Sequence, residues 1–201
     1  GRSGRETIMP LSAEKLDRAI NRPAERVGVT FEQGLVSAII GDVNYQPGVL
    51  PLLQYALTEL FEQRKGRVLT REAYKAIGGT VGALAKRAEE VYLNLDAASQ
   101  EVTRQIFLRL VSVGENIEET RRRTARSELR ALTQDTDALD EIIDTFVSYR
   151  LFSLDTDPST RSATVEVAHE ALLREWERLR SWLIEGRDDI KLQRQLANSA
   201  N

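Results

Sequence analysis

His169 is the only histidine in this 201-residue sequence, and it stands where a strand-like stretch gives way to a helix-like one. Residues 164–168 alternate at the strand period, and the apolar residues after residue 170 recur at helical spacing. An imidazole at a helix N-terminus lies beside unpaired backbone amides, a place that suits a phosphate group. His169 is therefore a candidate phosphate contact. The competing interpretation is a histidine that caps the following helix and packs on the hairpin.

A second candidate is the stretch Pro-Gly-Val-Leu-Pro-Leu-Leu at residues 47–53. Its simplest interpretation is a helix start followed by core leucines, because proline is tolerated in the first turn of a helix. Two prolines and a glycine also present a flat apolar edge without large side chains. An adenine ring could rest against such an edge.

The motifs that would complete a catalytic site are missing from this sequence. There is no P-loop, nucleophile elbow, zinc-protease pair or dinucleotide fingerprint, and there is no cysteine to act as a nucleophile or thiolate ligand. One histidine cannot build a multi-histidine zinc centre. We therefore do not expect the isolated chain to be an enzyme.

The overall charge and hydropathy of the sequence disfavour nucleic acid and membranes as partners. The net charge of -3, from 28 basic and 31 acidic residues, gives no general attraction to nucleic acid or to an anionic membrane. No apolar run approaches the roughly 20 residues that span a bilayer, and the first residues lack the apolar core of a signal peptide. We expect a cytoplasmic protein without a membrane partner, and the two ends look like the cut edges of a fragment.

The helices and strands that must position His169 and residues 47–53 fall into two groups, one all-helical and one mixed. The first group, a helical bundle over residues 10–95, is expected to contain helices at 13–21, 31–42, 47–61, 71–77 and 81–95. Ser12 and Thr70 are the expected N-caps, and Pro23 is expected to close the first helix. This half of the chain should be all helix.

The second group, residues 96–185, mixes helices with short strands. Helices are expected at 98–113, 128–132, 138–149 and 170–184, with Ser127 capping the second, a short strand at 122–125, and a β-hairpin formed by 151–154 and 164–168. This order is typical of a winged helix. The predicted fold is therefore mainly α, a helical bundle followed by a winged-helix domain with a small β-hairpin, and residues 186–201 should begin a C-terminal linker helix.

A winged helix raises the alternative of a DNA-binding transcriptional regulator. Its third helix, near residues 138–150, carries Asp140, Glu141 and Asp144 against Arg150 alone, which opposes phosphate binding. The run Arg121 to Arg123 with Arg126 is the only basic cluster, and its simplest interpretation is a strand edge paired with acids such as Glu118 and Glu119. Nucleic acid is thus an unfavoured partner, and the regulator stays the runner-up.

The two candidate stretches together resemble a known family. Residues 47–53, followed by Val-Ala-His-Glu-Ala-Leu-Leu at 167–173 and then Trp176, are similar to the C-terminal part of a STAND-class signalling ATPase, of the bacterial kind often joined to WD repeats. Residues 11–16, 22–28, 78–84 and 120–123 match as well. The resemblance covers about residues 10–183.

The resemblance implies partners and a cofactor for this chain. An upstream P-loop domain would bind ATP or ADP with Mg²⁺, and the lid and winged helix would close over that nucleotide. A downstream sensor domain, commonly of WD repeats, would follow, and nucleotide exchange would permit a homo-oligomer. The parent protein would then be an ATPase, with this chain as its regulatory segment.

The resemblance also implies which residues face the nucleotide. Gly48 and Pro51, with Leu52, match the lid motif that is placed against adenine and ribose. His169 matches the winged-helix histidine that senses the ADP β-phosphate. Within the arginine run, we expect Arg122 to meet the nucleotide or an acidic surface of the upstream domain.

Overall fold

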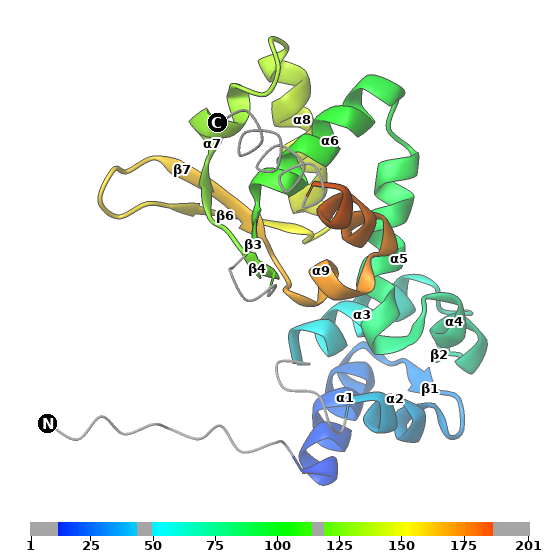
Figure 1. The fold of residues 1–201 in the computed structure, drawn as a ribbon. Coiled ribbons are helices and arrows are strands. Elements are labelled where there is room, and N and C mark those ends of the chain that lie inside the picture. Colours follow the sequence, from blue (N-terminus) through cyan, green and yellow to red (C-terminus); the bar gives the residue numbers. More distant parts are fainter. Residues whose placement is uncertain (1–11, 44–49, 114–118, 187–201) are drawn as a thin grey trace, which may run out of the picture. The chain divides into compact units, whose positions relative to one another are not determined.

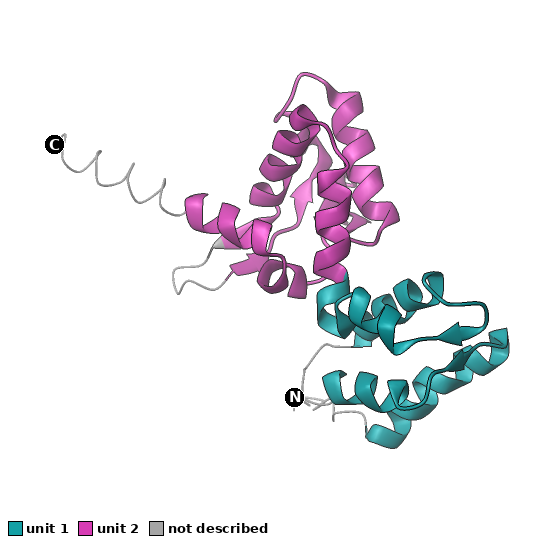
Figure 2. Ribbon diagram, turned by 90° about the vertical axis from the view of Figure 1, so that its right-hand side faces the viewer, with its two compact units in different colours: residues 1–83 teal, residues 84–201 magenta. Residues whose placement is uncertain are grey.

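The computed structural model describes residues 12–43, 50–113 and 119–186, and this part of the chain is mainly helical with small sheets. It divides into two compact units, Gly1–Ala83 and Leu84–Asn201 (Figure 2). The division falls inside helix α5 (Gly79–Leu93), whereas the boundary expected from the sequence, between residues 95 and 96, lies just beyond the end of that helix.

Unit 1 is built from helices with one short strand pair. Its elements are α1 (Ala13–Val27), β1 (Thr30–Phe31), α2 (Leu35–Val43), α3 (Leu50–Glu62), β2 (Val68–Leu69), α4 (Arg71–Ala76) and the start of α5 (Figure 1). Strands β1 and β2 run parallel, with Thr30 opposite Val68 and Phe31 opposite Leu69. The expectation of an all-helical half is therefore wrong in this one detail.

Helix α1 does not stop at residue 21 as expected but continues through Pro23 to Val27. Proline removes one intrahelical hydrogen bond, and the burial of Ile20 and Ala24 on either side of it offsets that loss. The helix ends instead at Gly28, whose φ of 69° is the left-handed conformation of a helix C-cap. A Cβ at Gly28 would also lie 2.6 Å from the Arg67 Nη2 atom.

The other helix starts of unit 1 follow from caps and strand pairing. Thr70 caps α4 as predicted, because its hydroxyl accepts the Ala73 N–H at 3.2 Å. Ser12 occupies the N-cap of α1 without a side-chain hydrogen bond. Helix α2 begins later than the expected residue 31, since residues 30 and 31 form β1.

Unit 2 contains the remainder of α5, further helices and two small antiparallel sheets. Its further elements are α6 (Ala97–Arg109), β3 (Val111–Val113), β4 (Glu119–Arg121), β5 (Thr124–Ala125), α7 (Arg126–Arg130), α8 (Thr136–Ser148), β6 (Phe152–Thr156), β7 (Ala163–Val167) and α9 (Ala171–Glu175). A last helical stretch covers 177–186.

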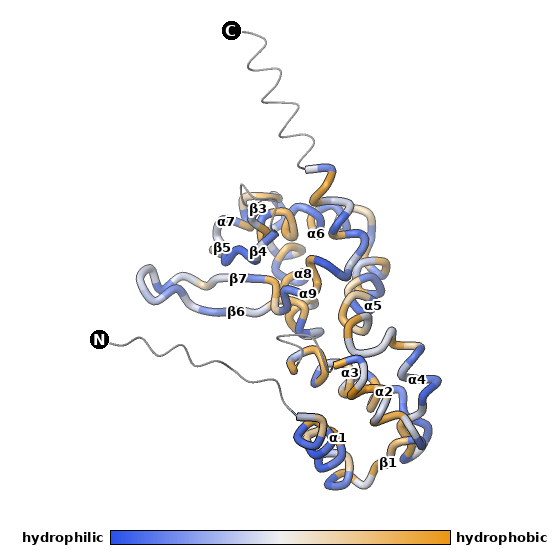
Figure 3. Tube along the Cα trace, turned by 60° about the horizontal axis from the view of Figure 1, so that its bottom comes forward, coloured by the Kyte–Doolittle hydropathy of each residue, from blue (hydrophilic) through white to orange (hydrophobic). Residues whose placement is uncertain are grey.

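Two sheets organise unit 2. Strands β5, β7 and β6 form a three-stranded antiparallel sheet with β7 in the middle, and β3 pairs with β4 as a separate ribbon. The hairpin β6–β7 was predicted and is confirmed; it extends past the neighbouring helices (Figure 1) and ends in a hydrophilic turn (Figure 3).

Several predicted elements of unit 2 are corrected. Helix α6 ends at Arg109 rather than 113, because Val111–Val113 pairs with β4, which itself precedes the strand expected at 122–125. Helix α7 starts at Arg126 with Ala125, not Ser127, in the N-cap position. The expected helix 170–184 is interrupted at Trp176, whose ψ of 102° is extended.

The core of unit 2 contains a cluster of aromatic rings. The ring of Phe107 on α6 lies 4.9 Å from that of Phe152, 5.0 Å from Trp176 and 5.5 Å from Phe146, measured between ring centres. Such edge-to-face and tilted pairs stabilise beyond the burial of their area. The break at Trp176 therefore places an indole in this core that a continuous helix would direct elsewhere.

Candidate functional site

His169 follows directly on the middle strand β7, and the backbone that leads into it is held on two sides. The Arg121 Nη1 atom donates to the carbonyl oxygens of Val167 at 3.1 Å and Ala168 at 3.2 Å. The Ala168 N–H donates to the Leu151 carbonyl at 2.9 Å. The backbone immediately before His169 is thus held by Arg121 at the end of β4 and by Leu151 just before β6.

The charge state of His169 follows from its surroundings. The side chain is partly buried, and this burial, followed by the positive charge of Arg121, lowers the pKa of His169 from its ordinary value. Both effects disfavour the imidazolium form. The imidazole is therefore largely neutral at pH 7, and an anion placed beside it would favour its protonation.

The helix that was expected to present its N-terminus at His169 is short. Helix α9 has five residues and no side-chain hydrogen bond at its N-cap, Glu170. The Leu172 N–H bonds the His169 carbonyl at 3.0 Å. With one turn of helix, the aligned peptide dipoles contribute little, so the positive potential here comes mainly from Arg121.

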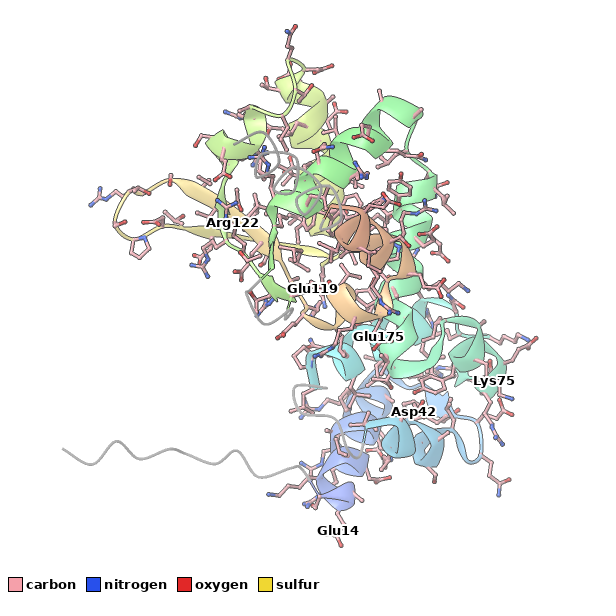
Figure 4. The ribbon with its side chains drawn as sticks, viewed as in Figure 1. Glu14, Asp42, Lys75, Glu119, Arg122 and Glu175 are labelled. Atoms are coloured by element: carbon pink, nitrogen blue, oxygen red, sulfur yellow. The ribbon has the colours of Figure 1, made fainter. Side chains whose placement is uncertain are left out.

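Arg122, the arginine expected to face the nucleotide, lies on a different side of the chain from His169. Its Nη2 atom donates to both carboxylate oxygens of Glu128 on α7, at 3.1 and 3.2 Å. Arg122 itself is labelled in Figure 4. Successive side chains of an extended segment point to opposite sides. The structure therefore brings Arg121 to His169 and directs Arg122 to α7.

The other arginines of this cluster pair with acids, as the simplest interpretation of the run expected. Arg123 lies 3.0 Å from Asp155 and 3.5 Å from Glu166 of the hairpin. Arg126 lies 2.9 Å from Asp140 on α8. Of the acids expected as partners, Glu118 lies outside the described residues. The pairs named here join the arginines to acids that the fold of unit 2 brings near.

The lid motif is only partly within the described residues. Gly48 lies outside them, Pro51 is exposed in the first turn of α3, and Leu52 is 6% exposed. The side chain of Leu52 is therefore part of the buried core. Leu50, in contrast, is 46% exposed.

Unit 1 holds an apolar pocket of about 550 Å³ beside the start of α3, which sequence reasoning did not identify. It lies between α1 and α3, and its lining is apolar apart from Gln54 and Thr58; the lining includes Ile20, Pro23, Leu50, Leu53, Leu57 and Phe61. The leucines of α3 thus divide between core and pocket. Helical periodicity alone cannot distinguish these two environments.

Unit 1 also contains a buried polar cluster, formed by Tyr74, Thr80 and Asp42, that the sequence did not predict. The Tyr74 hydroxyl accepts the Thr80 N–H at 3.1 Å, donates to Asp42 Oδ2 at 2.7 Å and lies 2.8 Å from the Thr80 hydroxyl. Gly79, with a φ of 69°, permits this arrangement, because a Cβ there would lie 3.3 Å from Asp42 Oδ2. The cluster anchors the start of α5.

The described residues show neither a cluster of metal-binding side chains nor a helix that could span a membrane. Across residues 12–43, 50–113 and 119–186, no three or more histidine, aspartate or glutamate side chains gather as a metal ion would need. None of the helices in these stretches is both long enough and apolar enough to cross a bilayer.

Comparison with known proteins places the chain in a family. A family model described as Novel STAND NTPase 1 matches residues 2–201, nearly the whole sequence. No curated protein and no solved structure matches. The match agrees with the resemblance to STAND-class ATPases that residues 47–53 and 167–173 carry. The chain therefore belongs to the Novel STAND NTPase 1 family.

Proposed function

We propose that this chain is the lid and winged-helix segment of a STAND signal-transduction NTPase, closing over ADP or ATP that an upstream P-loop domain holds. Unit 1 would be the lid. The order α6, β5, α7, α8, β6, β7 in unit 2 supports this assignment, because it matches the order of elements in a winged helix. Strands β6–β7 would then be the wing and β3–β4 an added ribbon.

The observation that carries this proposal is the placement of His169 beside the permanent charge of Arg121, at the end of the central strand of unit 2. An imidazole N–H can donate to a terminal phosphate oxygen, and a nearby guanidinium favours the anion. Family membership supplies the reason for an NTP-related ligand. The sequence has no P-loop motif, so the proposal assigns the phosphate-binding loop and Mg²⁺ to another domain.

The role of the chain is then regulatory. A contact with the terminal phosphate that forms in one arrangement of the domains and is lost in another couples the bound nucleotide to the conformation. Pro51 and the apolar pocket beside Leu50 offer surface on which a base could pack. Nucleotide hydrolysis in the parent protein would reset the switch, and a downstream sensor domain would read or set it.

The proposal is tested by ADP binding to the longer protein that includes the P-loop domain. We expect His169→Ala to weaken ADP binding about 10- to 100-fold, the range for a hydrogen bond to a charged group. Arg161→Ala, in the turn of the hairpin, is the matched control and should leave binding unchanged. Unaltered ADP affinity in the His169 variant would remove the sensor role.

A further inference from the structure

In the sequence, the ribbon β3–β4 lies between α6 and β5. A minimal winged helix needs no strands at this point. The last residue of the ribbon is Arg121, which pairs with Val111 across it. The side chain of Arg121 reaches β7, 46 and 47 residues further along the chain. The ribbon thus delivers one cationic side chain to the backbone immediately before His169.

The hydrogen bonds and ion pair of Arg121 leave part of its guanidinium group accessible to a ligand. Its two hydrogen bonds to carbonyl oxygens both come from Nη1, one of three nitrogens in a group with five N–H donors. Its ion pair with Glu166 is long, at 3.9 Å, and the Arg121 side chain is 36% exposed. The guanidinium is therefore held in place and still accessible to a solute.

His169 and Arg121 would contribute different properties to the binding of a phosphate. A largely neutral His169 offers a hydrogen-bond donor but little charge, whereas Arg121 keeps its charge at every physiological pH. A terminal phosphate carries between one and two negative charges near pH 7. A single neutral imidazole leaves that charge uncompensated, and the neighbouring guanidinium supplies the compensation.

We propose that Arg121 and His169 act together as the phosphate-contacting pair of this segment, with Arg121 as its charged member and the terminal phosphate of a nucleoside diphosphate as its ligand. The identity of the ligand rests on the function proposed above. The pair itself rests on the hydrogen bonds that join Arg121 to residues 167 and 168. Arg122, one residue away and bound to Glu128, is excluded from it.

The first test uses the 201-residue chain and inorganic pyrophosphate. Because His169 is the only histidine, one imidazole signal in a proton–carbon NMR spectrum reports its pKa directly. We expect pyrophosphate to raise the pKa of His169 in the wild type. Arg121→Met should raise that pKa without ligand, since a positive neighbour is removed, and should abolish the response to pyrophosphate.

Two further variants serve as controls for this test. Arg122→Met removes an adjacent arginine that binds Glu128, and it should behave as the wild type. Arg121→Lys keeps the charge and loses the guanidinium geometry, so it should retain a reduced response. This variant also keeps the test decisive if Arg121→Met does not fold. An imidazole that ignores pyrophosphate in the folded wild type overturns the proposal.

The second test compares ADP with AMP in the longer protein. We expect Arg121→Met to weaken ADP binding about 10- to 100-fold, because it removes a charged hydrogen bond to the terminal phosphate, and to leave AMP binding unchanged. An equal loss for ADP and AMP would mean that Arg121 only holds the end of β7 in place. That outcome overturns the pairing.

The two proposals fail in different ways. If His169→Ala weakens ADP binding and Arg121→Met does not, the proposed function stands and the pairing with Arg121 is wrong. If pyrophosphate shifts the imidazole signal in an Arg121-dependent way and the longer protein does not bind ADP, the anion-binding pair stands and the nucleotide function is wrong.

Discussion

The side chain of Tyr74 holds residues 78–80, at the start of α5, in place. Its hydroxyl contacts Asp42 at the end of α2 and both the backbone and the hydroxyl of Thr80 in α5. Burial raises the pKa of Tyr74, so the hydroxyl stays protonated and continues to donate to Asp42. The Gly78-Gly79-Thr80 stretch, which matched STAND proteins in sequence, thus has a structural role in starting α5.

At this residue we expect Tyr74→Phe to lower the free energy of unfolding by about 1–2 kcal/mol, because it leaves the N–H of Thr80 without its acceptor. Thr80 is only 1% exposed, so water replaces that acceptor poorly. Urea denaturation followed by circular dichroism measures the change. Tyr149→Phe, at a residue that is 41% exposed, is the control. Equal stability of the two variants would contradict the role given to the Tyr74 hydroxyl.

At the scale of elements, the break at Trp176 is held by helix α5. The Trp176 indole N–H donates to Glu89 Oε2 at 2.7 Å, and Arg178 Nε donates to the same oxygen at 2.9 Å. The guanidinium of Arg178 also lies over the ring of Tyr92, 4.5 Å from its centre. One carboxylate therefore joins α5 to the residue at the break and to the helical stretch that follows it.

Glu89→Gln should destabilise unit 2 by about 1–2 kcal/mol at pH 7, the lower part of the range for charged hydrogen bonds, since the Glu89 and Arg178 side chains are each 33% exposed. Fluorescence during denaturation is the measurement, because both tryptophans, Trp176 and Trp182, lie in unit 2. Glu90→Gln, which removes a carboxylate that is 45% exposed and pairs with Arg87, should cost less.

The same substitution has a predicted pH dependence. The hydrogen bond from Arg178 is the main cause that holds the pKa of Glu89 below its ordinary value of 4.5. The stability that this ionised carboxylate contributes is complete above pH 4.5 and is lost as the pH falls through the lower folded value. The difference between wild type and Glu89→Gln should therefore shrink on acidification below pH 4.5. A constant difference would contradict an ionic origin.

At the scale of the whole molecule, the distribution of charge separates the proposed function from DNA binding. Helix α8 would be the recognition helix of a DNA-binding winged helix. Its carboxylates Asp140 and Asp144 bind Arg126, at 2.9 and 3.4 Å, and Arg130 also binds Asp140. The basic residues nearest to α8 are thus engaged by its own acids, which leaves little positive charge for phosphates.

We expect no sequence-specific shift of duplex DNA by this chain at physiological salt in an electrophoretic assay, because binding to DNA depends on phosphate neutralisation by basic side chains. Asp140→Asn with Asp144→Asn should increase non-specific binding at low salt, since it releases Arg126 and Arg130. A specific shift by the wild type would instead favour a transcriptional regulator.

The family and most elements could be read from the sequence. Thr70 capped α4 as expected, and the strand period at residues 164–168 predicted the hairpin. The motifs at residues 47–53 and 167–173 led to the STAND family. These features depend on neighbours within a few residues, where caps, turns and periodicity act.

Other features needed contacts between residues far apart in the chain. The pairing of Thr30 with Val68 replaced the expected start of α2, and packing around Trp176 broke a segment with unbroken helical periodicity. Tertiary structure also decided that Arg121, and not Arg122, lies beside His169. A sequence shows a run of arginines, but the side on which each emerges is set by the register of β4 with β3 and by its contact with β7, 46 residues away.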